Sequence, residues 1–255
     1  MTTSPAPRTA VVTGGNRGLG RSTVLALARD GVDVVLTYRS HPEEAAAVVA
    51  EVEALGAHAA ALRLDTAEHT TFAAFADELR ATLSTWDRSG VDLLVNNAGH
   101  ATVTRLGATT AADLDGLYAV HFRAPFLLTQ ELAPVLADGG AVVNLSSGLA
   151  RFAGDGWSAY GSMKAAIEQL TRYWAKELGA RGIRVNAVAP GPIGTDFGGG
   201  AVRDNDAVRQ AMAGQAALGR VGEPDDIGPL VAAMLADSMR WVTGQRIEAS
   251  GGTLL

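Results

Sequence analysis

The sequence predicts an α/β protein with a doubly wound parallel sheet of about seven strands and helices on both faces. Short apolar, β-branched segments alternate with segments of helical periodicity along all 255 residues. The apolar segments are continuous runs, which is typical of strands that are buried on both faces. Neither a Pro/Ser-rich linker nor a charge block nor a repeat divides the chain, so we expect residues 1–255 to form a single domain.

The first strand, turn and helix form the clearest unit. Residues 9–13 (TAVVT) are apolar and β-branched, and they end abruptly at Gly14 and Gly15. Residues 18–30 follow with apolar side chains three or four positions apart. This pattern predicts a strand, a glycine turn and a helix.

The same alternation continues to the C-terminus. The later strands are expected from aliphatic or β-branched runs at 33–38, 58–64, 92–96, 140–145, 183–189 and 244–249. Helices are expected from apolar spacing at 42–55, 67–84, 111–137, 157–180 and 224–236, with a glycine-rich stretch at 191–201. Right-handed crossovers bring the carboxyl ends of all strands to one edge, where such sheets bind ligands. Residues that follow the strands are therefore the first candidates for chemistry.

Composition argues against several classes of function. The formal net charge of −6 removes the positive surface that binding to nucleic acid or to an anionic membrane requires. The lack of cysteine excludes disulfides, thiolate catalysis and Cys-ligated metals, and the five histidines form no i, i+4 pair, so no metal site is expected. Without an export signal or a run of about 18 apolar residues, we expect a cytoplasmic protein without membrane spans.

The turn after the first strand reads TGGNRGLG, with glycines at positions 14, 18 and 20. Glycine lets the backbone turn tightly and lets a phosphate approach the helix N-terminus, whose N–H groups and positive dipole end favour an anion. Such a turn on its own is also compatible with an ordinary loop. Its place at the start of the first βαβ unit favours nucleotide binding.

This TGxxxGxG pattern, together with motifs after the later strands, resembles the short-chain dehydrogenase/reductase family. The further motifs are Asp65, Asn96-Asn97-Ala98-Gly99, the set Ser147, Tyr160 and Lys164, Asn186, Pro190 to Thr195, and Ser250-Gly251-Gly252. The resemblance covers nearly the whole chain. It implies a Rossmann-like fold and an oxidoreductase that transfers hydride between a nicotinamide and a small-molecule carbonyl or alcohol.

The resemblance also implies which residues hold the cofactor. Asp65 and Thr66 would contact the adenine, Asn97 the ribose region, and Ile193 and Thr195 the nicotinamide carboxamide. Taken in isolation, Asp65 could equally be a solvated side chain and PGPIGT a plain turn. The implied cofactor-binding set is Gly14, Asn16, Arg17, Gly18, Leu19, Gly20, Arg39, Asp65, Thr66, Asn97, Tyr160, Lys164, Pro190, Gly191, Ile193 and Thr195.

The end of the second strand distinguishes NADP(H) from NAD(H). An acidic residue there would bind the ribose 2′-hydroxyl and repel a 2′-phosphate, whereas an arginine accommodates the phosphate. The chain has Tyr38-Arg39-Ser40 at this point, and Arg17 in the glycine turn supplies a second cation. Two guanidinium groups can both form charge-assisted hydrogen bonds to one phosphate. We therefore predict NADP(H), although Arg39 alone could equally be a solvated arginine.

Tyr160 and Lys164 are four residues apart and so lie on one face of the expected helix. Spacing alone is compatible with ordinary packing, but Lys164 is one of only two lysines, and a retained lysine indicates a need for a compact ammonium. A nearby ammonium and the cofactor's positive nicotinamide are expected to lower the pKa of the phenol.

In the family, the tyrosine exchanges a proton with the substrate, the lysine holds the nicotinamide ribose and a serine polarises the substrate oxygen. Ser147 matches the family's spacing to Tyr160, which leaves Ser146 as a strand-end backbone partner.

His121 departs from the family pattern. The family usually has Asn at this position, in a sequence like VNxxxPF, and the chain reads Val120-His121-Phe122-Arg123-Ala124-Pro125-Phe126. In the family that Asn supports a water-linked proton path to the lysine. Because a neutral imidazole offers one donor and one acceptor, we include His121 in the catalytic set with Ser147, Tyr160 and Lys164. A satisfied core histidine is the alternative.

Several functions compete. An NADP(H)-dependent carbonyl reductase, or the reverse alcohol dehydrogenase, is favoured because the Ser, Tyr and Lys are all present. A 3-oxoacyl-acyl carrier protein reductase would need basic residues for its acidic partner, and residues 136–140 carry none. A non-catalytic NADP(H)-binding sensor is motivated only by His121. A dehalogenase or dehydratase on the same scaffold also stays open. Loss of the glycine turn would favour the dehalogenase, but the turn is intact.

By resemblance, the loop near His100, residues 148–157 and residues 196–215 would wall the substrate pocket, the last as a candidate lid. Trp157 and Phe152 would suit an apolar or aromatic substrate, although core packing explains them equally well.

The resemblance also implies a homotetramer. The expected helices 111–137 and 157–180 and the apolar end Thr253-Leu254-Leu255 are its candidate surfaces. A chain that ends in two leucines is stabilised when they are buried.

Overall fold

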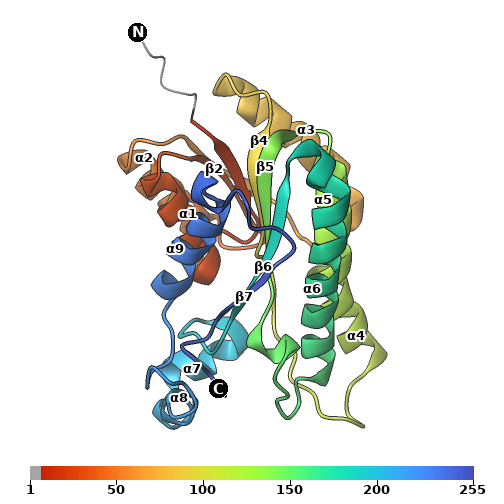
Figure 1. The fold of residues 1–255 in the computed structure, drawn as a ribbon, viewed down its shortest axis with the longest axis vertical. Coiled ribbons are helices and arrows are strands. Elements are labelled where there is room, and N and C mark those ends of the chain that lie inside the picture. Colours follow the sequence, from red (N-terminus) through yellow and green to blue (C-terminus); the bar gives the residue numbers. More distant parts are fainter. Residues whose placement is uncertain (1–6) are drawn as a thin grey trace.

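The computed structural model describes residues 7–255 and contains one seven-stranded sheet between two layers of helices (Figure 1). Its strands are β1 (Thr9–Val12), β2 (Asp33–Tyr38), β3 (Ala59–Arg63), β4 (Val91–Asn96), β5 (Leu136–Leu145), β6 (Arg184–Pro190) and β7 (Arg246–Ala249). The strand order is β3-β2-β1-β4-β5-β6-β7, and every neighbouring pair is parallel. The predicted doubly wound fold is confirmed.

The helices cover both faces of the sheet. They are α1 (Gly18–Arg29), α2 (Pro42–Ala54), α3 (Phe72–Thr85), α4 (Ala111–Tyr118), α5 (Ala124–Leu132), α6 (Ser158–Leu178), α7 (Ala201–Asp204), α8 (Asp206–Ala213) and α9 (Pro224–Leu235). Helices α1, α2 and α9 pack on one face and α3, α5 and α6 on the other (Figure 1). Side chains alternate along a strand, so Val12 belongs to the hydrophobic core on the side of α1, α2 and α9. Its neighbour Val11 belongs to the core on the side of α3, α5 and α6. None of the helices within this part of the chain is long and apolar enough to cross a membrane.

The helix expected at 111–137 is shorter and less regular than predicted. It runs through α4, a π-helical segment at Ala119–Arg123 and α5, and it ends at Leu132. Pro134 explains the early end, because proline has no N–H to donate and its ring clashes with the preceding turn. Strand β5 correspondingly begins at Leu136, four residues before the predicted start.

The segment after β6 also differs from the prediction. Residues 191–201 are indeed glycine-rich, but helices α7 and α8 follow and were not expected. Gly198, Gly199 and Gly200 all have left-handed backbone conformations, with φ of 63°, 76° and 76°. Only glycine adopts three such conformations in succession without strain.

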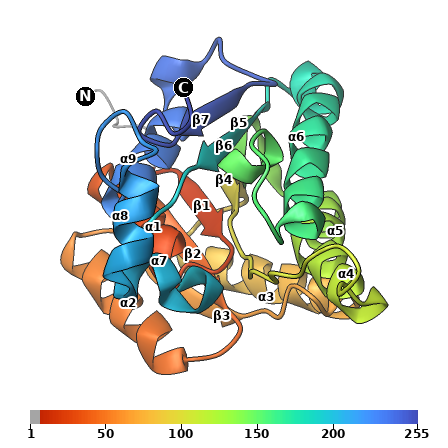
Figure 2. The ribbon, with the colours of Figure 1, turned by 90° about the horizontal axis from the view of Figure 1, so that it is seen from below.

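All seven strands end at the same edge of the sheet. Figure 2 looks onto this edge from below and shows α7 and α8 beside the ends of the strands. Three segments meet there: the turn after β1, the loop after β5 and the segment after β6. The predicted site residues come from these three segments, from α6, from the loops after β2, β3 and β4, and from the π-helical segment Ala119–Arg123.

Candidate active site

The glycine turn between β1 and α1 has a backbone that only glycine permits. Gly14 and Gly18 lie in the left-handed region, with φ of 63° and 54°. A Cβ on Gly20 would lie 2.1 Å from the carbonyl oxygen of Gly14. The side-chain amide of Asn97 donates to the carbonyls of Thr13 at 2.8 Å and Gly14 at 3.0 Å, and so holds the turn in place.

The turn fits an anionic group. Helix α1 begins at Gly18, no acidic residue lies in its first turn, and the side chain of Arg17 does not cap its N–H groups in the described structure. The positive end of the helix dipole is therefore not compensated locally. The nearest atom to a Cβ placed on Gly18 would be Thr195 Cγ2 at 3.7 Å, so Thr195 lies across from the turn, as its predicted role requires.

The two arginines expected to share a phosphate have different surroundings. Arg17 Nη1 lies 2.6 Å from a carboxylate oxygen of Asp196, which belongs to the predicted lid segment. Arg39 is exposed after β2, and its backbone carbonyl accepts a 3.4 Å hydrogen bond from Arg63. The ion pair with Asp196 was not predicted, because no local pattern connects residues that lie so far apart in the sequence.

Other predicted cofactor residues have clear structural roles as well. The amide of Asn16 donates to Glu44 at 2.8 Å, and Asp65 accepts from the backbone N–H of Ala67 at 3.0 Å. A Cβ on Gly191 would lie 2.7 Å from the side chain of Ser250, so this position needs glycine where two loops cross. The remaining predicted residues lie at the start of α1 (Leu19), in the loops after β3 and β6 (Thr66 and Ile193) and at the end of β6 (Pro190).

The structure brings Ser147, Tyr160 and Lys164 together. Ser147 follows β5, and its side chain hydrogen-bonds to the Tyr160 phenol and accepts from the N–H of Leu149 at 3.2 Å. Lys164 Nζ donates to the carbonyl of Leu145 at 2.7 Å and lies 5.7 Å from the centre of the Tyr160 ring. An ammonium has three donors, so two remain that suit the hydroxyl groups of a ribose.

Burial is the main cause of the pKa shifts of Tyr160 and Lys164. It raises the pKa of Tyr160, and the hydrogen bond from Ser147 opposes this rise only in part. Burial also lowers the pKa of Lys164 to about 8. Without the cofactor the net shift of the Tyr160 pKa is therefore upward, opposite to the direction expected when Lys164 and a positive nicotinamide act together. At neutral pH Tyr160 carries its proton and can act as an acid.

His121 lies in the π-helical segment and is almost fully buried. Its Nε2 donates to the carbonyl of His100 at 2.7 Å, and its ring meets Tyr160 edge-on at 5.2 Å. Burial and the nearby Lys164 hold the pKa of His121 well below its usual value, so the ring is neutral. Within residues 7–255 its Nδ1 has no hydrogen-bond partner. Gly99 leaves room for the ring, because a Cβ there would lie 2.8 Å from His121 Cε1.

Aromatic side chains surround the Tyr160 ring. Trp157 lies 5.4 Å away in a T-shaped arrangement, and Phe197 from the predicted lid lies 5.8 Å away. Phe152 instead lies under the guanidinium of Arg151, at 5.3 Å. Sequence reasoning thus identified Trp157 and missed Phe197, whose only signal was a large apolar residue in a glycine-rich stretch.

Comparison with known proteins gives consistent results. The family described as Enoyl-(Acyl carrier protein) reductase matches residues 14–253. The 3-oxoacyl-[acyl-carrier-protein] reductase FabG of Staphylococcus aureus is 34% identical over 249 residues, which cover 96% of this chain and 97% of that protein.

Two similar solved structures are ketoreductases. The promiscuous reductase LugOII, which catalyses keto-reduction at C1 during lugdunomycin biosynthesis, is 40% identical with a TM-score of 0.92, and the match covers 97% of this chain and 98% of that chain. The angucycline C-6 ketoreductase LanV with bound NADP is 34% identical with a TM-score of 0.91, covering 97% of this chain and 95% of that chain.

The buried ammonium of Lys164 predicts an unusual dependence of stability on pH. Its pKa is about 8 in the folded protein and 10.5 ordinarily, so above pH 8 the unfolded chain binds more protons and stability rises with pH. The raised pKa of Tyr160 reverses this trend above about pH 10. We expect the free energy of unfolding to gain about 2–3 kcal/mol between pH 8 and 10, measured by urea denaturation.

Lys164→Met should abolish most of this gain, and the matched change Lys176→Met at an exposed position should preserve it. Equal pH dependence in the two variants would contradict the assignment to Lys164.

Proposed function

The chain belongs to the short-chain dehydrogenase/reductase family, and we propose that it reduces small carbonyl compounds with NADPH, or oxidises the corresponding alcohols with NADP⁺. The observation that carries this conclusion is the convergence of Ser147, Tyr160 and Lys164 beside the glycine turn. Each group has the chemistry that carbonyl reduction needs, and the geometry places them at the edge where parallel sheets bind nucleotides.

The protein's own residues supply the proton chemistry. Bound NADPH supplies the hydride that adds to the carbonyl carbon. Ser147 and Tyr160 hydrogen-bond to the carbonyl oxygen, and Tyr160 gives its proton to that oxygen as negative charge develops. Lys164 holds the ribose through its two remaining donors and stabilises the tyrosinate that proton transfer leaves. In alcohol oxidation the same proton returns to Tyr160.

We assign the cofactor's phosphates to the positive segments of the site. The N-terminus of α1 would hold the pyrophosphate, and Arg39 and Arg17 would bind the 2′-phosphate. NADP bound to LanV supports this choice of nicotinamide cofactor. To reach a phosphate, Arg17 would exchange its ion pair with Asp196 for the new anion, which would couple cofactor binding to residues 196–215 as a lid.

Apolar and aromatic ketones fit the site best. Trp157 and Phe197 flank Tyr160. The loop at Thr104, which a 2.9 Å backbone hydrogen bond joins to Gly156, would form one wall of the substrate site. The two similar ketoreductases, LugOII and LanV, support the same reaction class. A planar aryl ketone would stack against these rings.

A carrier-bound 3-oxoacyl substrate is the second candidate, and the similarity to FabG favours it. The lack of basic side chains at residues 136–140 does not exclude this substrate, because these residues form the start of β5. They therefore lie at the edge of the sheet opposite to Ser147. Arg181 also pairs with Asp138 there. Parallel assays with free ketones and with a 3-oxoacyl carrier protein separate the two substrates.

A homotetramer stays part of the proposal. An aromatic row, Tyr118, Phe122, Phe126 and Trp174, runs across α4, α5 and α6, and Tyr118 and Phe126 are exposed. Leu255 is 94% exposed, which is consistent with burial against another copy. A cytoplasmic location also stays a prediction.

Tyr160→Phe tests the reaction directly. This change removes only the phenol hydroxyl, so we expect turnover of a cyclic aryl ketone to fall at least a hundredfold while NADPH binds normally. NADPH oxidation is followed by absorbance and binding by fluorescence. Tyr173→Phe, at an exposed position on the same helix, serves as the control and should keep full activity. Retention of more than a few per cent of activity in Tyr160→Phe would exclude Tyr160 as the acid.

Arg39→Asp tests the choice of cofactor. Losing one charge-assisted contact to the 2′-phosphate costs roughly 1.5–3 kcal/mol, about ten- to a hundredfold in NADPH affinity. The new carboxylate repels the phosphate and suits a free 2′-hydroxyl, so the preference should shift toward NADH. Arg29→Asp, at the exposed far end of α1, controls for the change in net charge. An unchanged ratio of NADPH to NADH affinity would refute the role of Arg39.

We propose that His121 takes part in the proton path to Lys164. Asparagine can replace its donor to His100, whereas leucine cannot, so His121→Asn should stay active and His121→Leu should lose about ten- to a hundredfold in kcat. The measurement is kcat against pH for both variants and the wild type. Coincident profiles in folded variants would show that His121 only packs against Tyr160.

A further inference from the structure

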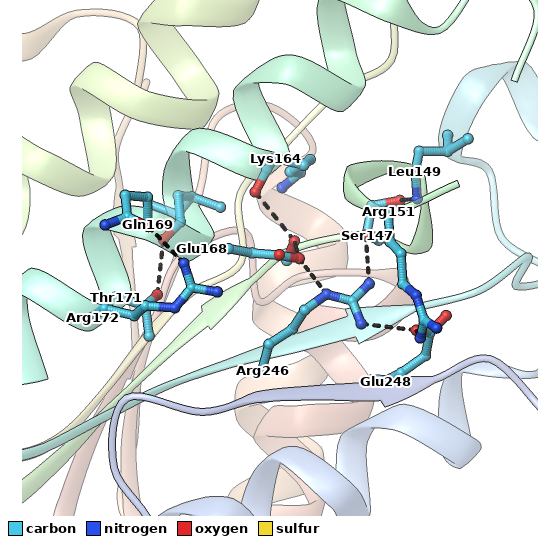
Figure 3. Close-up of polar contacts among 12 residues, drawn as sticks. Ser147, Leu149, Arg151, Lys164, Glu168, Gln169, Thr171, Arg172, Arg246 and Glu248 are labelled. Carbon is cyan, nitrogen blue, oxygen red and sulfur yellow. Dashed lines mark hydrogen bonds and ion pairs between the residues drawn. The ribbon is translucent and has the colours of Figure 1, made fainter. Parts of the chain in front are cut away.

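A buried charge cluster lies directly behind the serine loop. On α6, Glu168 follows Tyr160 and Lys164 at successive steps of four residues, so all three lie along one side of the helix. The Glu168 carboxylate accepts a 2.5 Å hydrogen bond from the hydroxyl of Ser146. The same carboxylate lies 2.6 Å from Nε of Arg246 (Figure 3). The Ser146 hydroxyl also lies 3.3 Å from the carbonyl oxygen of Lys164.

Arg246 reaches this cluster from β7 by crossing β6. The sheet register pairs Arg246 with Ala187 and Glu248 with Ala189. Paired residues of neighbouring strands project from the same face, and the two alanines carry only a methyl group each. The long side chain of Arg246 can therefore lie over β6 and extend to the end of β5.

The guanidinium joins three elements. It contacts Glu168 on α6 through Nε, Glu248 on β7 through Nη1 at 2.8 Å, and the backbone carbonyl of Ser147 through Nη2 at 3.4 Å. The side chains of Arg246, Glu168 and Glu248 are 16%, 11% and 19% exposed, so water screens these contacts weakly. Figure 3 shows Arg246 between Glu168, Ser147 and Glu248.

We propose that Arg246 is a positioning residue for the reductase activity, an inference that rests on the proposed function. By holding Glu168 and the Ser147 carbonyl together, it fixes the distance between the loop that carries Ser147 and the helix that carries Tyr160 and Lys164. A displacement of about 1 Å in such a group costs up to a hundredfold in rate. Arg246 touches neither substrate nor cofactor and acts through Ser147.

The variants must separate positioning from stability. Arg246→Met alone leaves the partly buried Glu168 without a counter-charge and leaves Glu248 only its 3.3 Å contact with Arg151, and such a variant can fail to fold. The triple variant Arg246→Met, Glu168→Gln, Glu248→Gln removes the guanidinium together with both carboxylates that it pairs with, and it leaves only Arg151, whose side chain is 62% exposed, as a charge beside position 248. Arg246→Lys keeps the charge but replaces the planar fork with a single nitrogen that cannot reach all three groups. Arg172→Met is the control, because Arg172 lies on α6, is exposed and contacts Gln169.

The kinetic readout is kcat, KM and the pH profile for reduction of a cyclic aryl ketone. We expect kcat to fall ten- to a hundredfold in the triple variant and less in Arg246→Lys, with NADPH affinity unchanged. The Ser147 hydrogen bond opposes the rise in the pKa of Tyr160. Lys164 and His121 are the other titratable groups that face the Tyr160 ring. Loosening Ser147 should therefore move the alkaline limb of the profile to higher pH.

Hydrogen exchange of the peptide 145–152 is the readout that needs no activity. The N–H groups of Ser146, Leu149 and Ala150 are bonded within this corner, to Val188, to the Ser147 hydroxyl and to the Ser147 carbonyl. They should exchange faster in the triple variant than in Arg172→Met.

A lower melting temperature with unchanged kcat, pH profile and exchange would overturn the proposal and leave Arg246 a purely structural residue. If the wild type reduces no ketone at all, the proposed function fails instead. The exchange of residues 145–152 then decides the positioning role alone, and unchanged exchange overturns it.

Discussion

The contact between the ends of β1 and β4 is the constraint on which the rest of the site depends. The hydroxyl of Thr13 accepts from the N–H groups of Asn97 and Ala98 at 2.9 and 3.0 Å, while the Asn97 amide donates back to the carbonyls of Thr13 and Gly14. These are the two strands between which the sheet order reverses. The interlock uses polar groups that a buried strand end would otherwise leave unpaired, and its result is a rigid glycine turn at the point where ligands bind.

A second buried polar chain sets the position of α6 against the sheet. The Asn96 amide donates to Asn144 at 2.8 Å, and the Asn144 amide donates to Thr171 at 2.9 Å. Because buried amides are costly without partners, this chain is satisfied in only one register of β4, β5 and α6. Tyr160 and Lys164 lie on the same helix as Thr171, so the register of a structural network also decides where the proposed proton donor lies.

Local patterns predicted the parts of the molecule that local physics determines. Continuous apolar strands and the turn TGGNRGLG gave the sheet, the crossovers and the edge that carries the site. Pro134 is a local signal as well, because a proline inside the expected helix 111–137 indicates that the helix ends before it, as α5 does at Leu132. The ion pair of Arg17 with Asp196, the contact of Phe197 with Tyr160 and the raised pKa of Tyr160 depend on residues brought together by the fold. Periodicity carries no information on such contacts.

The features that oppose stability are concentrated at this same edge. Lys164 is a buried ammonium, His121 has a buried nitrogen without a hydrogen-bond partner in residues 7–255, and Gly198 begins three left-handed residues in succession. Each raises the free energy of the folded state, because desolvating a charge, leaving a polar atom unpaired and ordering glycine all have a cost. The two apolar cores on either side of the sheet offset these costs. The fold thus keeps a locally unfavourable arrangement at the edge of the sheet where the proposed site for hydride and proton transfer lies.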